Sequence, residues 1–185
     1  MSSSTQQHRP EGSHSENAAL DSDLAKLFEH QLQDTYYAEK AITKALPKLI
    51  KAANSTELKD AFEKHLSQTE GHVARLETVF KMIGLKAEGT PCEAINGILR
   101  EGDELAAEFG KTKAADACLA AAAQAVEHYE ISRYGALKAW AHELGLKKAV
   151  ALLEATEGEE IETDQILSDM AAHFNADAVG DQARS

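Results

Sequence analysis

Apolar residues recur at steps of three and four positions along most of this chain, the spacing that places them on one face of an α-helix. The pattern covers a first long segment, residues 22–53, and three more at about 54–83, 114–144 and 146–173. A shorter segment with the same spacing covers residues 92–109. Because apolar and polar residues do not alternate as in a half-buried strand, we predict that all five segments are helices.

Residues that favour helix ends separate these segments. Asn54 has Glu57 three positions later, which is the arrangement of a capping box at a helix start. Gly84 and Gly145 follow the second and third long segments, where glycine commonly ends a helix. Pro47 lies in the last turns of the first segment, and we expect a kink or a break there because proline removes a backbone hydrogen bond.

Short turns between neighbouring long segments predict two antiparallel helix hairpins. The segment at 92–109 is long enough to carry the chain from one hairpin to the other. This order predicts an all-α fold, a ferritin-like four-helix bundle over residues 21–175 with one crossover connection that carries a short extra helix. Residues 1–20 and 176–185 lack the helical pattern, and we expect both to be disordered tails.

Polar side chains lie on or beside the apolar stripe near the middle of each long helix. Unpaired buried carboxylates are costly, and Arg133, the base best placed to balance them, is a single charge. Two divalent cations would balance four carboxylates, and an oxygen-rich site with one imidazole suits iron or manganese. The polar residues on these stripes are Asp34, Glu39, His65, Thr69, His72, Glu127, Glu130, Thr156, Glu159, Glu160, Thr163 and Asp164.

Several of these residues also have a simpler explanation. Carboxylates at the edge of a stripe usually face water and pair with a lysine one turn away, which remains open for Asp34, Glu127 and Asp164. His65 could be a core histidine that donates a hydrogen bond to Thr69 or to a backbone carbonyl.

Other polar and aromatic residues are expected to lie outside the site. Glu70 and His72 are two positions apart, so their side chains diverge by ~200° and cannot bind the same ion. We therefore expect Glu70 to face solvent. His128 is expected on the surface, and Tyr134 is expected to be a packing residue.

Three glycines interrupt the long helices on faces that point away from the apolar stripe: Gly71, Gly135 and Gly158. Each costs ~1 kcal/mol relative to alanine in a helix. Close approach by the crossover segment or by a partner subunit would explain them, and we expect a homodimer that forms through these faces.

Composition narrows the classes of partner and compartment. The net charge of −12 repels nucleic-acid phosphate and anionic lipid, so we expect neither nucleic acid nor membrane as a partner. No apolar run reaches the ~18 residues of a membrane span. The N-terminus has no apolar signal region, and Cys92 and Cys118 form no disulfide framework. A cytoplasmic location fits these features best.

Four stretches of the chain, QDTYYAEKAITKALPKL, AFEKHLSQTEGHVARLE, AAAQAVEHYEISRYGAL and EEIETD, resemble the YciE/YciF family of ferritin-like stress-associated proteins. The resemblance covers about residues 22–175. It implies a rubrerythrin-related four-helix bundle, a dimer and a dinuclear metal centre, with iron as the expected metal, but no settled reaction. Carried onto this chain, the metal-binding residues that it implies are Asp34, Glu39, His65, Glu127, Glu130, Glu160 and Asp164.

The chain departs from the usual ferritin-like pattern of Glu-x-x-His on two helices. Phe62 occupies the position three residues before His65, and the fourth long helix has Glu157 and Glu160 at this spacing with no central histidine. Fewer imidazoles mean a harder, more oxygen-rich site.

Two hypotheses on function follow. The first is a di-iron carboxylate protein that acts under stress and oxidises Fe²⁺ with O₂ or peroxide. In it, Glu39, Glu130 and Glu160 hold the ions together with neighbouring residues, and His65 supplies the nitrogen ligand. The second is a non-enzymatic helical dimer that binds metal or a partner protein.

Overall fold

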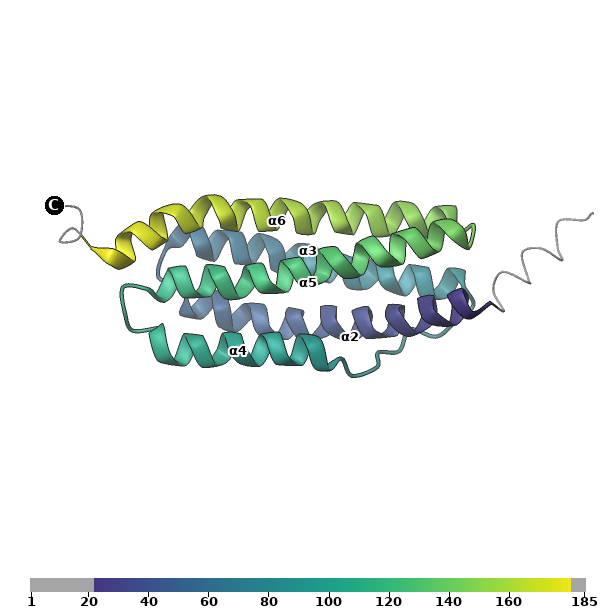
Figure 1. The fold of residues 1–185 in the computed structure, drawn as a ribbon, viewed down its shortest axis with the longest axis horizontal. Helices are drawn as coiled ribbons and strands as arrows, with labels where there is room; N and C mark the ends of the chain where they lie inside the picture. Colours follow the sequence, from purple (N-terminus) through teal and green to yellow (C-terminus); the bar gives the residue numbers. More distant parts are fainter. Residues whose placement is uncertain (1–21, 181–185) are drawn as a thin grey trace, which may run out of the picture.

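The computed structural model describes residues 22–180, and these contain five α-helices and no strand. Four long helices lie side by side along the molecule, and a shorter one lies against them (Figure 1). The predicted all-α bundle is confirmed. The tail predicted at residues 1–20 lies outside the described residues. The helices are α2 (Asp23–Ala52), α3 (Thr56–Met82), α4 (Glu93–Phe109), α5 (Ala115–Glu143) and α6 (Lys147–Val179).

The connection between the two hairpins sets the topology of the bundle. α2 packs along α3 and α5 packs along α6, so each hairpin buries its own apolar faces. Between them the chain turns back, and α4 packs against α5 and α2. α5 therefore begins at the end of the bundle where α2 ends, and α3 and α5 run in the same direction (Figure 1). This is the predicted arrangement with one crossover.

The turn between α2 and α3 differs from the prediction in its capping residue. Ser55, rather than Asn54, is the N-cap, and its hydroxyl accepts a hydrogen bond from the backbone N–H of Leu58. The backbone N–H groups of Asn54 and Ser55 both donate to the carboxylate of Asp116 on α5, each at 2.8 Å. Asp116, near the start of α5, thus holds this turn in place. The local sequence pattern had predicted Asn54 as the N-cap of α3.

Helix α2 has no break at Pro47, and α6 ends later than predicted. α2 continues through Pro47 to Ala52 without a break, and Leu46 and Ile50 on either side of the proline pack in the core. α6 extends to Val179, so residues 176–179 are helical rather than part of a tail. Gly180, with φ +75°, follows the last helical residue.

Gly135 has an explanation within the chain, contrary to expectation. A Cβ atom at Gly135 would lie 3.0 Å from Oε1 of Glu157 on α6, so the glycine leaves room for this carboxylate, which pairs with Lys138. Nothing lies within 4 Å of a Cβ atom at Gly71 or Gly158. No contact among residues 22–180 accounts for those two glycines.

The buried core is divided along the bundle axis. One apolar cluster lies around Phe62 and Leu119 near α4, and the other lies around Phe28, Phe80 and Leu137 at the opposite end. Buried polar side chains from all four long helices lie between them. None of the helices in the described part of the chain combines the length and apolar character needed to cross a membrane.

The Asp116 contact provides a test of how the two hairpins are joined. Asp116→Ala should lower the free energy of unfolding by about 1–2 kcal/mol, because two backbone N–H groups lose a charged acceptor. Urea unfolding followed by circular dichroism measures the change. Asp60→Ala, which removes an exposed acid from α3, serves as the control. Equal stabilities of the two variants would contradict a joining role for Asp116.

Candidate metal centre

The buried polar residues come from the middle turns of the four long helices, where each helix faces the bundle axis. α2 contributes Glu39, α3 contributes His65 and His72, and α6 contributes Glu160. α5 contributes Glu127 and Glu130, three positions apart on one face. All of these side chains are buried, with 3% exposure or less.

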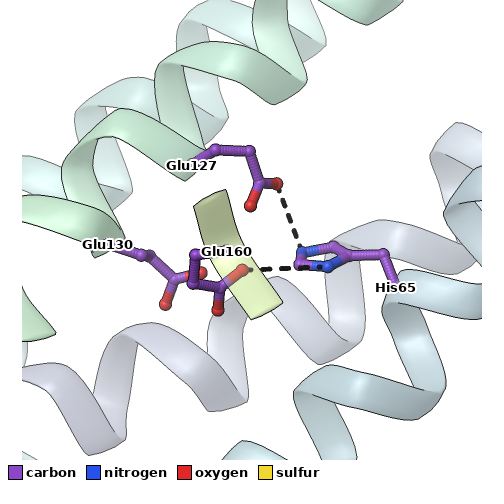
Figure 2. Close-up of side chains that lie close together, drawn as sticks. All are labelled: His65, Glu127, Glu130 and Glu160. Carbon is purple, nitrogen blue, oxygen red and sulfur yellow. Dashed lines mark ion pairs between the residues drawn. The ribbon is translucent and has the colours of Figure 1, made fainter. Parts of the chain in front are cut away.

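The first group of candidate ligands is formed by His65, Glu127, Glu130 and Glu160. One ligand atom from each lies within 4.8 Å of those of the other three. Nε2 of His65 lies 3.2 Å from Oε1 of Glu127, and Nδ1 lies 3.9 Å from Oε2 of Glu160. Figure 2 shows the imidazole of His65 turned toward the carboxylates of Glu127 and Glu160.

The second group shares Glu160 with the first and adds Glu39 and His72. Nδ1 of His72 lies 2.9 Å from Oε1 of Glu160 and 3.3 Å from Oε1 of Glu39. The hydroxyl of Tyr134 donates a hydrogen bond to the same oxygen of Glu39. The two groups are therefore adjacent, and the Glu160 carboxylate lies between them.

Several carboxylate oxygens in these groups have no aligned hydrogen-bond donor. Among the described residues, neither oxygen of Glu130 or Glu160 makes a directed hydrogen bond, and one oxygen each of Glu39 and Glu127 also makes none. Arg133 does not fill this gap, because it donates to Gln31 and lies over the ring of Tyr129. Buried oxygens without donors are what hard divalent cations require as ligands, so the residues present fit a metal centre.

The electrostatics of the cluster without cations follow from burial. Burial raises the pKa of Glu127 and Glu130 well above the ordinary value of 4.5, and the neighbouring carboxylates act in the same direction. Burial also raises the pKa of Glu39. For Glu160, burial acts to raise the pKa, but the contacts with His72, His65 and Glu127 together outweigh it and the pKa is lowered. Glu160 is therefore the carboxylate of the cluster that stays charged most readily.

The two histidines respond in opposite ways. Burial lowers the pKa of His65, which favours the neutral imidazole that binds metals. Burial acts in the same direction on His72, but its contacts with Glu160 and Glu39 raise the pKa to about 10. In the cation-free protein His72 is thus an internal positive charge, and a metal ion would have to replace its proton.

The structure brings together five of the seven residues implied as ligands and leaves two outside both groups. Asp34 lies five residues from Glu39, or about 140° around α2, and accepts a hydrogen bond from Gln31. Asp164 lies one turn beyond Glu160 and contacts Gln124 and the exposed His128. Both of these aspartates therefore have polar partners at the flank of the bundle core.

The implied ligand set omitted His72, although the helical pattern placed it on an inward face. The available signal was its position seven residues after His65, which puts both rings on the same side of α3. Tyr134 is buried as expected and also contacts Glu39. Glu70 is exposed, as predicted.

The fold and these groups together define a helical bundle protein with a carboxylate–histidine cluster in its core. Comparison with known proteins confirms the predicted family. The model of the family described as Domain of unknown function (DUF892) matches residues 23–179, and the chain belongs to this family. It is 43% identical to Protein YciF of Escherichia coli K12 over 149 residues, which are 80% of this chain and 90% of YciF.

Solved structures of relatives share the fold. The crystal structure of the E. coli stress protein YciF matches with a TM-score of 0.79 and 41% identity, over 83% of this chain and 97% of that one. YcfI from Rhodopseudomonas palustris matches with a TM-score of 0.77 and 44% identity, over 80% of this chain and 94% of that one.

The raised pKa values predict an unusual pH dependence for the metal-free protein. Above pH 4.5 the native state keeps protons on Glu127 and Glu130 that the unfolded chain releases, and above pH 6.5 it keeps one on His72. Stability should therefore fall as the pH rises from 4.5 to about 10. Urea unfolding of chelator-treated protein across this range measures the slope.

Replacing Glu130 measures how much one carboxylate contributes to this dependence of stability on pH. Glu130→Gln should flatten the slope and raise stability at mildly alkaline pH by about 1 kcal/mol or more, because the native state then no longer has to hold a proton on a carboxyl group that is ionised in the unfolded chain. Glu63→Gln, at an exposed position of α3, should change neither quantity. Stability that rises with pH in the wild type would show that these carboxylates do not carry the raised pKa values.

Proposed function

We propose that this chain is a dinuclear-metal carboxylate protein that binds two divalent cations in the two ligand groups joined by Glu160. The observation that carries the proposal is that both oxygens of Glu130 and of Glu160 are buried without an aligned donor, next to two imidazoles. Iron is the metal we expect, and manganese suits the same oxygen-rich ligands.

Charge balance supports two ions rather than one. Glu39, Glu127, Glu130 and Glu160 would carry four negative charges when ionised, which two divalent cations neutralise if both histidines are neutral. A single cation would leave two buried negative charges in an environment where burial already raises the pKa of Glu127 and Glu130. Those carboxylates would then keep a proton instead of binding metal.

The residues around the groups have separate tasks in this proposal. Glu160 would contact both ions, and Tyr134 would hold the carboxylate of Glu39 in place through its hydroxyl. The apolar clusters on both sides exclude bulk water, which strengthens electrostatic interactions inside the core.

The reaction that we propose for the site is oxidation of Fe²⁺ by O₂ or peroxide under stress. Two bound Fe²⁺ ions would supply the electrons that reduce the oxidant. A ligand set rich in carboxylates and poor in imidazole is hard, and hard ligands favour Fe³⁺ over Fe²⁺. The description of the E. coli relative YciF as a stress protein is in keeping with this role.

A non-enzymatic role is the alternative, and one observation favours it. His72 lies within ion-pair distance of Glu39 and Glu160, so the cluster already contains a partial counter-charge without metal. The same ligands could then hold a metal ion passively, or the bundle could serve as a partner-binding dimer.

We include a homodimer and a cytoplasmic location in the proposal. Gly71 on α3 and Gly158 on α6 leave open space for a neighbouring molecule, and Ile161, one turn from Gly158, is 51% exposed. Two free cysteines, Cys92 and Cys118, fit a reducing compartment.

Metal stoichiometry tests the proposed ligands. The wild type, stripped with chelator and reloaded without O₂, should bind two Fe²⁺ or Mn²⁺ per chain by elemental analysis. Glu160→Ala should lose both ions because its carboxylate belongs to both groups, whereas Glu39→Ala should retain the ion of the other group. Glu63→Ala is the control, and wild-type occupancy in the Glu160 variant would exclude this ligand set.

Oxygen consumption separates the two functions. Adding Fe²⁺ to the metal-free protein in air should consume O₂ and produce ferric absorbance faster than in buffer alone. Glu130→Ala should show no acceleration. Stoichiometric iron binding without O₂ or peroxide consumption would support the non-enzymatic alternative.

A further inference from the structure

Each buried histidine of the metal centre uses one ring nitrogen for a hydrogen bond to α6, and its other ring nitrogen faces the carboxylates of the ligand groups. Nε2 of His72 contacts a carboxylate oxygen of Glu159, and Nδ1 of His65 contacts the hydroxyl of Thr163. The remaining nitrogens, Nδ1 of His72 and Nε2 of His65, are buried and make no aligned hydrogen bond. The two rings thus leave opposite nitrogens available.

The partner of His72 is a carboxylate that is itself held in place. Oε2 of Glu159 lies 2.8 Å from Nε2 of His72. Arg75 donates to both oxygens of Glu159, at 2.7 and 2.8 Å, and also to the hydroxyl of Thr156 at 3.2 Å. Because an ionised carboxylate only accepts hydrogen bonds, Nε2 of His72 carries the proton in this contact.

The partner of His65 is a hydroxyl whose proton is already used. Thr163 donates to the backbone carbonyl of Glu159 at 3.0 Å, so its oxygen is left to accept a hydrogen bond. Nδ1 of His65 lies 3.3 Å from this oxygen and is the donor that fits. His65 therefore carries its proton on Nδ1.

We propose that Glu159 and Thr163 are positioning residues that fix opposite tautomers of the two histidines, so that His72 binds its metal ion through Nδ1 and His65 binds through Nε2. The two residues lie four positions apart on α6, on either side of the shared ligand Glu160. One turn of α6 therefore supplies the common carboxylate and sets the ligand atom of both imidazoles.

The carboxylate of Glu159 and the hydroxyl of Thr163 differ in strength as hydrogen-bond acceptors for the two imidazoles. A carboxylate that accepts the second ring proton makes an imidazole a stronger metal ligand than a neutral hydroxyl does. The group with Glu39, His72 and Glu160 has one carboxylate fewer than the other group, and it has the stronger second partner. Loss of Glu159 should thus weaken this group selectively.

For His72 the inference rests on the proposed function as a metal-binding protein. The tautomer of His65 can be tested without metal. In metal-free protein labelled with ¹⁵N-histidine, two-bond ¹⁵N–¹H correlation spectra at mildly alkaline pH should show the proton of His65 on Nδ1. After addition of Zn²⁺, a diamagnetic probe, His72 should keep its proton on Nε2 while the Nδ1 resonance shifts. A proton on Nε2 of His65, or on Nδ1 of zinc-bound His72, would overturn the assignment.

Variants test whether α6 causes these tautomers. Thr163→Val keeps the side-chain volume but removes the acceptor, so His65 should become a mixture of tautomers, and Thr163→Ser should restore the Nδ1–H form. If Thr163 only fills space, the valine variant should keep the wild-type tautomer of His65. That result would overturn the role of Thr163.

Zinc titration by calorimetry tests Glu159. Glu159→Ala should weaken one of two Zn²⁺ sites by about 10–100-fold and leave the other unchanged. Glu154→Ala, at an exposed position of the same helix, is the control. Equal weakening of both sites, or none, would overturn the role of Glu159. A wild type that binds no Zn²⁺, Fe²⁺ or Mn²⁺ would instead refute the proposed function, while the His65 tautomer would still test the role of Thr163.

Discussion

Burial of several negative charges at one level of a helical bundle is the constraint on which the rest of this structure depends. The four glutamates of the two ligand groups come from three helices and converge without enough donors to satisfy their oxygens. Such an arrangement persists only when protons, an imidazolium or metal ions compensate the charge. His72 compensates part of it, and the proposed cations would compensate all of it.

The rest of the core is arranged around this polar layer. Apolar side chains are separated into two clusters, one on each side, which supply the hydrophobic stabilisation that the centre lacks. The residues that contact the centre also range from buried to partly exposed. Tyr134 contacts Glu39 deep in the core, whereas Glu159 and Arg75 connect His72 to the partly exposed surface of α3 and α6.

Helical periodicity predicted the bundle well because it reports which face of each helix is buried. It was less reliable at positions that depend on another helix. Asp116 from α5 completes the turn in which Ser55, rather than Asn54, begins α3. Packing of the residues around Pro47 keeps α2 continuous where local preference suggested an interruption. In both cases a contact between elements distant in sequence outweighed the local signal.

The sequence by itself determined the five helices, their order, and the inward positions of Glu39, His65, Glu130 and Glu160, because each follows from side-chain spacing within one helix. Only the tertiary structure decided which inward groups meet. It left Asp34 and Asp164 at the flank, brought His72 to Glu39 and Glu160, and placed Glu159 and Thr163 behind the histidines. The physical reason is that periodicity gives the direction of a side chain, whereas a ligand site also needs the axial register and rotation of neighbouring helices, which packing sets.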